Sequence, residues 1–419
     1  MEHLLLVSAF VVLCYALVSA IIPKTLLTAP LCFVAAGVML SEILTLSVEL
    51  DLAKLIEKVA ELTLVILLFT DASRIDVRVL TRELGYPVRL LSIGMPLTIG
   101  LGMLAAWWIF PEFTVWEAAL LAAILAPTDA ALGQAVVSSS RVPQRIRQAL
   151  NVESGLNDGI AVPFVLLFAS LAAVTSDSES VTHWLLFWAK QVTLGPVVGV
   201  AVGAIGGKLL DFATAKGWVM DSFMQLSGIA LAILAWSIAT TVDGNAFIAA
   251  FSAGLAIASM TQSVKPVIQN FAETEGQLLS LVTFLLFGAV LVVPAFRAAG
   301  WSDWLYAILS LTVIRMIPVT VSLIGTKLHR STMLFMGWFG PRGLASVIFA
   351  LLVTSEHSFP HGDSLFNVVI LTATLSVLVH GMTALPGVAA YSRIIRAEEH
   401  QDRSEHDPVT EHPLRHRVV

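Results

Sequence analysis

The stretch AAILAPTDAALG, residues 122–133, places a proline and an aspartate in the middle of an apolar segment. Pro127 has no backbone N–H, and its ring clashes with the carbonyl of Ala123, so a helix through this segment must kink or break. Backbone freed in this way is tolerated at membrane depth only where it is buried in protein or lines a water-filled cavity. Because Asp129 lies at the break, the segment predicts a discontinuous membrane helix that carries its own acid.

The composition is that of a protein that crosses a membrane several times. Of the 419 residues, 57% are hydrophobic and 13% are charged, whereas about 25% of an ordinary soluble domain is charged. This composition excludes a soluble enzyme, and the spread of apolar segments excludes a single-pass receptor. No basic patch for nucleic acid is visible. Cys14 and Cys32 both lie in apolar segments, so neither a disulfide framework nor a metal cluster is expected, and no cofactor is implied.

Apolar segments of the roughly 20 residues that a membrane helix needs recur between polar loops along the chain. We therefore predict an all-α polytopic membrane protein with about thirteen transmembrane helices. The predicted spans are residues 4–22, 25–41, 53–71, 86–110, 115–137, 149–174, 183–207, 221–241, 245–260, 275–296, 303–326, 332–355 and 365–390.

The distribution of lysine and arginine predicts the orientation of the chain, because these residues are enriched in cytoplasmic loops. If the N-terminus lies outside, each cytoplasmic loop carries a lysine or an arginine, and the outside loops carry Arg297 alone. The C-terminus is then cytoplasmic. We predict that residues 1–390 form one transmembrane domain and that the charged residues 391–419 form a disordered cytoplasmic tail.

The sixth predicted span opens with NVESGLNDG, residues 151–159. At about 100° per residue, Glu153, Ser154, Asn157 and Asp158 share one helix face of roughly 140°. Because a charged side chain at the bilayer centre costs at least about 2.5 kcal/mol, the acids on spans 5 and 6 indicate a function. The alternative is a helix N-terminus at the cytoplasmic interface, with Glu153 in its first turn. This alternative fits Glu153 better than Asp158, which lies two turns further in.

A second interruption occurs in WFGPRG, residues 338–343, within the twelfth predicted span. The residues that break this helix are Gly340, Pro341 and Gly343. Interruptions at corresponding positions of two halves indicate an inverted-repeat transporter with its site near the midplane. We predict two inverted six-helix repeats, spans 1–6 and 8–13, whose discontinuous helices 5 and 12 cross. Arg342 needs an acidic partner inside the bilayer, and Glu153 is the candidate.

Several motifs in order along the chain carry a resemblance to a known family. They are APTDA at 126–130, NVESGLNDGIAVPFV at 151–165, NAFIAAFSAG at 245–254, GQLLSLVTFLLFGAVL at 276–291, WFGPRG at 338–343 and VLVHGMTALP at 377–386. Together they resemble the sodium/proton exchanger group of cation:proton antiporters, of the NhaP type. The resemblance covers about residues 4–390 and implies exchange of a monovalent cation for a proton across the cell membrane, for pH and cation homeostasis.

The resemblance also implies roles for individual residues. Asp158 would bind the cation and the proton, and a structural ion pair would join Glu153 to Arg342. The residues implied to help coordinate the cation are Thr128, Asp129 and Ser154. Asn157, where some relatives carry a second aspartate, implies one-for-one, electroneutral exchange. The family is homodimeric, with a core bundle that includes spans 5, 6, 12 and 13 and a separate dimerisation bundle.

The chemistry of these residues fits such an exchange. Burial disfavours the charged form of a carboxyl group, so Asp158 could hold a proton and release it to a cation. Hard monovalent cations prefer oxygen ligands, and no cluster of histidine and cysteine is present to favour zinc or copper. Sodium is the first candidate, ahead of lithium and potassium. The alternatives are a cation channel, which would need a continuous polar lining, and a cation-coupled symporter of a small solute.

Two further residues in apolar segments have a structural and a functional interpretation. Arg315 lies in the eleventh predicted span, where pairing with an acid of the core is favoured over contact with the ion. His380 lies in the thirteenth, where a hydrogen-bonded core histidine is favoured over a proton relay.

Overall fold

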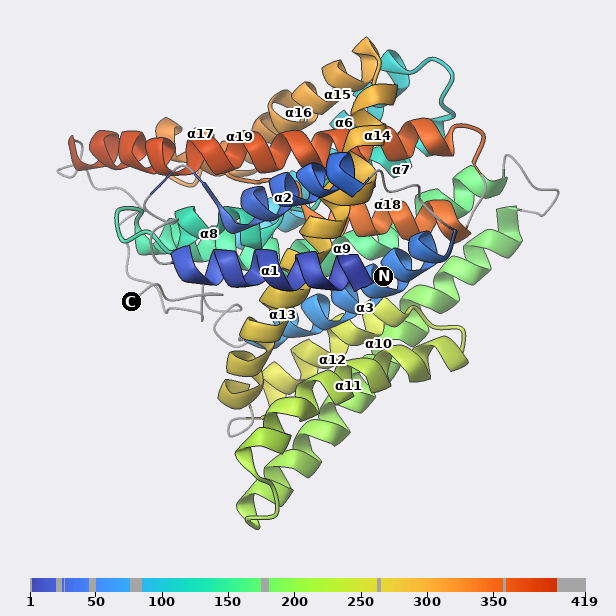
Figure 1. The fold of residues 1–419 in the computed structure, drawn as a ribbon, viewed down its shortest axis with the longest axis vertical. Coiled ribbons are helices and arrows are strands. Elements are labelled where there is room, and N and C mark those ends of the chain that lie inside the picture. The colour runs from blue at the N-terminus through green and yellow to red at the C-terminus, as the bar shows by residue number, and fades with distance from the viewer. Residues whose placement is uncertain are drawn as a thin grey trace.

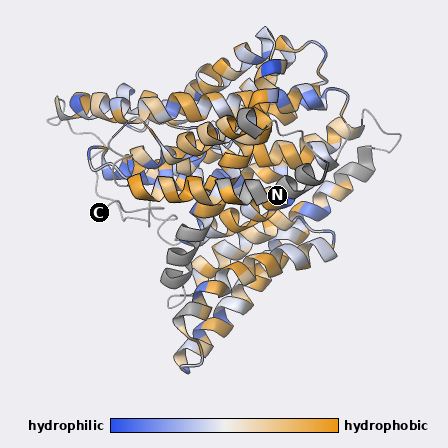
Figure 2. Cartoon of the chain, viewed as in Figure 1, coloured by the Kyte–Doolittle hydropathy of each residue, from blue (hydrophilic) through white to orange (hydrophobic). Residues whose placement is uncertain are grey.

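The computed structural model describes residues 2–19, 25, 27–44, 50–75, 85–174, 181–261, 265–356 and 359–397. Within these ranges all regular elements are helices. Figure 1 shows a layered bundle in which α1 and α19 run roughly parallel in projection, with α2 drawn between them, while α10, α11 and α12 extend obliquely away from them. Apolar residues cover most helices (Figure 2). The predicted all-α membrane fold is therefore confirmed for the described residues.

Each predicted span coincides with one helix or with consecutive helices. In the first half these are α1 (Glu2–Val18), α2 (Ala29–Leu44), α3 (Leu50–Arg74), α5 (Gly85–Arg89) with η2 (Leu90–Gly94) and α6 (Met95–Ile109), α7 (Val115–Ile124) with α8 (Ala130–Val137), and α9 (Gln144–Val174). The long helix α10 (Val181–Ala215) follows. In the second half they are α11 (Asp221–Thr241), α12 (Ala246–Met260), α13 (Lys265–Phe287) with η3 (Gly288–Val292) and α14 (Val293–Ala298), α15 (Trp301–Leu311) with α16 (Val313–Ser322), α17 (Arg330–Trp338) with α18 (Leu344–Glu356), and α19 (Gly362–Ala397). The inverted relation between the two halves stays a prediction.

Both predicted interruptions are present. α7 ends at Ile124 and α8 begins at Ala130, and α17 ends at Trp338 while α18 begins at Leu344. Seven of the described helical segments are long and apolar enough to cross a membrane, and α7 and α18 are among the shorter apolar ones. The halves of each interrupted span are short because the break divides a crossing that neither half completes alone.

The outer end of the first interrupted span, the start of α7, is fixed by a helix cap. Thr114 accepts a hydrogen bond from the backbone N–H of Glu117, and the Glu117 carboxylate accepts one from the backbone N–H of Thr114. This reciprocal capping box fixes where α7 begins. Glu117 also accepts a hydrogen bond from the backbone N–H of His361, just before α19. The Glu117 side chain is therefore buried but satisfied.

Two predicted boundaries were wrong. α9 begins at Gln144, so Glu153 lies well inside the helix, and the alternative that placed it in a first turn is excluded. α19 continues to Ala397, past the predicted start of the tail at residue 391. Its last turns stay packed because the ring of Tyr391 stacks on that of Phe335 with 4.1 Å between centroids. The remainder of the predicted tail, residues 398–419, lies outside the described residues.

Candidate functional site

The two interrupted spans meet at their breaks. The backbone N–H of Asp129 donates a hydrogen bond of 2.8 Å to the carbonyl of Pro341. This bond joins the unwound segment between α7 and α8 to the one between α17 and α18. Backbone groups that no helix can satisfy are therefore paired across the crossing, as burial requires.

The Asp129 carboxylate caps both inner half-helices that start at the crossing. Its Oδ1 accepts a hydrogen bond of 2.7 Å from the N–H of Ala131 in α8, and its Oδ2 accepts one of 2.9 Å from the N–H of Leu344 in α18. The negative charge thus lies at the positive ends of two helix dipoles. Asp129 is nearly fully buried, and these contacts give it a structural task beside its predicted role as an ion ligand.

Gly343 makes this double cap possible, because a Cβ atom at residue 343 would lie 2.1 Å from Oδ2 of Asp129. We expect Gly343→Ala to break the bond to Leu344 and to lower stability by roughly 1.5–3 kcal/mol, the usual contribution of a hydrogen bond to a charged group. The measurement is thermal unfolding of the purified protein in detergent. Gly133→Ala in α8 is the matched control, since a Cβ there meets nothing within 4 Å. Equal unfolding temperatures for the two variants would contradict the double cap.

Polar side chains of α9 face the first break. The hydroxyl groups of Thr128 and Ser154 are 2.8 Å apart, and Nδ2 of Asn157 donates a hydrogen bond of 2.6 Å to Oγ1 of Thr128. Oδ1 of Asn157 is buried and accepts no hydrogen bond from the part of the chain that the structure describes. Asp158 is half-buried, and helical spacing puts it on the Ser154 side of α9. The predicted oxygen groups therefore come together, whereas their role as ion ligands stays a prediction.

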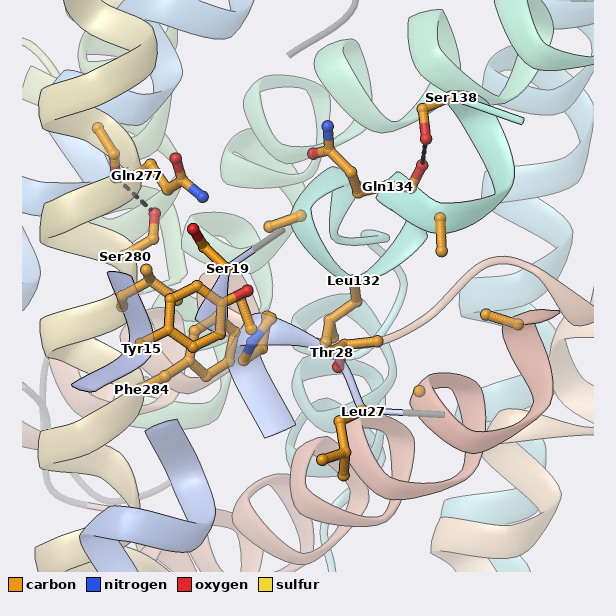
Figure 3. Close-up of a pocket in the computed structure, with 18 of the residues that line it drawn as sticks. Tyr15, Ser19, Leu27, Thr28, Leu132, Gln134, Ser138, Gln277, Ser280 and Phe284 are labelled. Atoms are coloured by element: carbon orange, nitrogen blue, oxygen red, sulfur yellow. Dashed lines mark hydrogen bonds between the residues drawn. The ribbon is translucent and has the colours of Figure 1, made fainter. Parts of the chain in front are cut away.

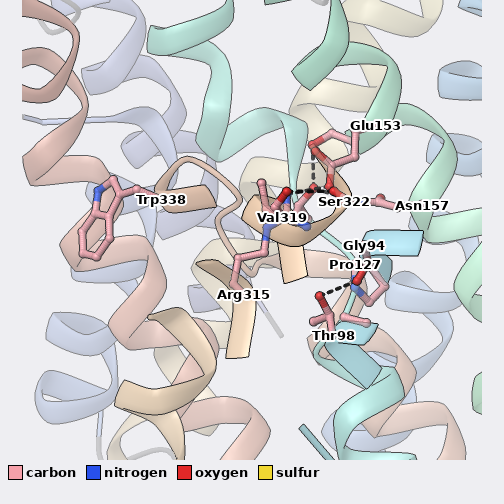
Figure 4. Close-up of polar contacts among 12 residues, drawn as sticks. Gly94, Thr98, Pro127, Glu153, Asn157, Arg315, Val319, Ser322 and Trp338 are labelled. Carbon is pink, nitrogen blue, oxygen red and sulfur yellow. Dashed lines mark hydrogen bonds and ion pairs between the residues drawn. The ribbon is translucent and has the colours of Figure 1, made fainter. Parts of the chain in front are cut away.

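The predicted ion pair between Glu153 and Arg342 is wrong. Glu153 pairs with Arg315 instead, with 2.5 Å between Oε1 and Nη2 and side chains that are 4% and 3% exposed (Figure 4). Arg315 reaches Glu153 because its guanidinium group passes Gly340, where a Cβ atom would lie 2.5 Å from Nε. The favoured interpretation of Arg315, pairing with an acid of the core, is confirmed.

Arg342 has another task at the crossing. Its Nη1 donates hydrogen bonds to the carbonyls of Ala126 and Pro127, at the end of the first unwound segment. Its side chain is fully buried. The positive charge of Arg342 therefore satisfies carbonyls freed by the break. This role of Arg342 could not be predicted, because freed carbonyls leave no mark of their own in a sequence.

A cavity of about 410 Å³ leads toward this crossing. Figure 3 shows Gln134 of α8, with Ser138 directly after this helix, on one side of the cavity and Gln277 and Ser280 of α13 on the other. Ala131, whose N–H the Asp129 carboxylate caps, also lines it. A smaller hollow nearby is lined by Ala130, Ser154, Pro341 and others. The face of α9 that carries Ser154 thus borders a small hollow at the crossing.

Arg74 of α3 lines both the cavity and a second small hollow, which it shares with Asp71 and Asn151. Asp71 and Arg74 are both buried. Charged side chains of α3 therefore lie next to the route that leads to the crossing.

Comparison with known proteins identifies the family. The sequence model described as "Sodium/hydrogen exchanger, transmembrane" matches residues 6–389. The chain is 28% identical over 344 residues to the K(+)/H(+) antiporter NhaP of Alkalimonas amylolytica, covering 78% of this chain and 56% of that protein. It is 30% identical over 270 residues to the Na(+)/H(+) antiporter 2 of Zygosaccharomyces rouxii, covering 60% of this chain and 33% of that protein. The chain thus spans about half or less of the length of these curated relatives.

The fold has a solved counterpart. The structure of the sodium proton antiporter MjNhaP1 from Methanocaldococcus jannaschii superposes with a TM-score of 0.74 at 19% sequence identity, covering 94% of this chain and 98% of that one. At this identity the likeness concerns the fold alone. Since the family match extends over nearly the whole described membrane region, the chain belongs to the sodium/hydrogen exchanger family.

Proposed function

We propose that the protein is a secondary active antiporter that exchanges a monovalent cation for a proton by alternating access. The observation that carries this proposal is the cluster of buried oxygen groups where two interrupted helices cross, with Asp158 beside it. A cation and a proton would compete for this carboxylate. If the site changes its accessible face only when one of them is bound, competition produces exchange. The relatives named above, one a K(+)/H(+) and one a Na(+)/H(+) antiporter, support the same proposal.

The ligands at the crossing suit an alkali cation. Thr128, Ser154 and Asn157 offer hydroxyl and amide oxygens near Asp158, and such hard oxygen donors match hard cations. No group of three or more histidine, cysteine or acidic residues among the described residues could hold a metal ion. Sodium is the first candidate cation, with lithium and potassium as the others.

The charge balance of the crossing supports electroneutral exchange. The ionisable groups named at the crossing are Asp129, Glu153, Asp158, Arg315 and Arg342. When all are ionised, these three acids and two bases leave one net negative charge. One proton or one monovalent cation neutralises it, so each half-cycle would carry the same charge.

The cavity supports an inward-facing state in the predicted orientation, with the N-terminus outside. It is lined by the C-terminal ends of α1, α3 and α8, which that orientation places toward the cytoplasm. The tail would then be cytoplasmic. A core bundle around the crossing would move against a dimerisation bundle, and two copies of the chain would form a homodimer in the cell membrane.

The proposal is tested with purified protein in lipid vesicles under an imposed proton gradient. We expect Na⁺, Li⁺ or K⁺ to dissipate the gradient with no net charge movement, while choline has no effect. Failure of all three alkali cations would refute the exchanger. Charge movement without proton coupling would indicate a channel instead, and dependence on an added organic solute would indicate a symporter.

A further inference from the structure

The unwound segment between α17 and α18 leaves backbone groups that need partners from another helix. Pro341 has no N–H, and its carbonyl accepts the hydrogen bond from Asp129. The carbonyl of Trp338 and the N–H of Arg342, which flank the turn at Gly340 and Pro341, both bond to side chains of α19. The carbonyl of Trp338 also accepts a hydrogen bond of 2.9 Å from the N–H of Gly340 within the turn. The two unwound segments must keep their conformation for the site at the crossing to form. The α19 side chains that bond to the second segment therefore affect that site.

Two residues one turn apart on α19 supply these partners. The N–H of Arg342 donates a hydrogen bond of 2.7 Å to Oγ of Ser376. Oγ of Ser376 lies 3.1 Å from Nδ1 of His380, and Nε2 of His380 lies 2.9 Å from the carbonyl oxygen of Trp338. Ser376 and His380 are almost completely buried. A single chain of hydrogen bonds therefore links the two ends of the unwound segment; the labelled Trp338 in Figure 4 marks one end.

The partners of His380 and the burial of its ring together decide which nitrogen carries the proton. A carbonyl oxygen can only accept, so Nε2, which faces Trp338, must donate. Nδ1 lies 3.1 Å from both Oγ and the carbonyl oxygen of Ser376. A charged ring could donate to that carbonyl, whereas in a neutral ring Nδ1 accepts from the Ser376 hydroxyl, which in turn accepts from the N–H of Arg342. The chain of donors is complete with a neutral ring. A charged ring would be buried with the guanidinium groups of Arg342 and Arg315 acting on it, and both would repel it.

We propose that His380 and Ser376 are positioning residues, which hold the unwound segment of the twelfth span in the shape that Asp129 needs, with His380 as a neutral Nε2–H donor throughout transport. The proposal rests on the proposed exchange activity for one of its readouts. The rival interpretation is that His380 carries or senses the transported proton. The two differ in whether the ring must titrate.

Substitutions of His380 separate the two contacts. Glutamine has the same number of bonds from Cα to Nε2 as histidine, so His380→Gln can keep the donation to Trp338 without a titrating group. Asparagine ends at the position of Nδ1, so His380→Asn can keep the contact with Ser376 but loses the one with Trp338. Ser376→Ala removes the acceptor for Arg342. Ser392→Ala is its matched control on α19, because within the described part of the chain that hydroxyl bonds only to the carbonyl of Ala389 in its own helix.

We expect exchange in vesicles to be within about twofold of wild type for His380→Gln, with an unshifted pH profile. Exchange should be on the order of tenfold slower for His380→Asn and Ser376→Ala, since one buried hydrogen bond is lost in each. Ser392→Ala should behave as wild type. A shifted pH profile in His380→Gln would establish the proton-carrying role and overturn the proposal. Equal exchange rates for His380→Gln and His380→Asn would also overturn it, because the contact with Trp338 would then have no effect.

Two measurements do not depend on transport and separate this proposal from the exchange activity. Nitrogen-15 NMR of histidine-labelled protein, with His380→Gln as the difference spectrum, should show a neutral ring protonated at Nε2. Hydrogen exchange measured by mass spectrometry should rise over residues 338–343 in His380→Asn and stay at the wild-type level in His380→Gln. An Nδ1–H or charged ring would overturn the positioning role even in an active exchanger. A wild type without exchange would refute the activity alone.

Discussion

Asp158→Asn is expected to abolish the coupled exchange of cation and proton. Asparagine matches the shape of aspartate but can neither hold the transported proton nor offer a negative charge to the cation. Thr128 and Ser154 would remain in place, because their contact does not involve residue 158. We expect exchange to fall by on the order of 100-fold or more, which corresponds to about 3 kcal/mol or more in the barrier.

The measurement is cation-driven dissipation of a proton gradient in vesicles that contain equal amounts of folded protein. Asp363→Asn is the matched control, since it makes the same change at an exposed residue in the first turn of α19. It should exchange as wild type does. Substantial exchange by Asp158→Asn would remove Asp158 from its proposed role and would direct attention to Asp129 or Glu153.

The breaks of the fold could be predicted because their causes are local in the sequence. Pro127 and Pro341 each remove a backbone donor and prevent a continuous helix, and the structure has both interruptions at the expected places. The shared face of Ser154 and Asn157 also followed from helical periodicity alone. Their meeting with Thr128 needed one more step, the expectation that freed backbone and polar side chains are buried together.

The pairing of charges could not be predicted in the same way. Two arginines were available for Glu153, and sequence offered no measure of which one could reach it. The outcome depends on the interruption of the eleventh span at Thr312, between α15 and α16, which no proline or glycine marks. It depends also on the space that Gly340 leaves. Such choices are made by tertiary packing, so they appear only in three dimensions.

Arg315→Met is expected to be the most destabilising single change in the core. It would leave the Glu153 carboxylate, 4% exposed, without the guanidinium group that lies 2.5 Å away. Breaking a buried pair by removing one partner typically costs about 3–5 kcal/mol, because the remaining charge is uncompensated. Glu153→Gln should destabilise for the same reason. The double variant should regain much of the loss, since replacing both partners removes the unpaired charge.

The four proteins of this double-mutant cycle are compared by thermal unfolding in detergent, with the exposed Arg393→Met as the control for loss of an arginine. The same cycle with Arg342→Met in place of Arg315→Met should show weaker coupling, because Arg342 bonds to the carbonyls of Ala126 and Pro127 rather than to Glu153. Coupling energies depend on direct contact between the two groups. Stronger coupling of Glu153 to Arg342 than to Arg315 would therefore show that the pair formed in the membrane is the one first expected from the sequence.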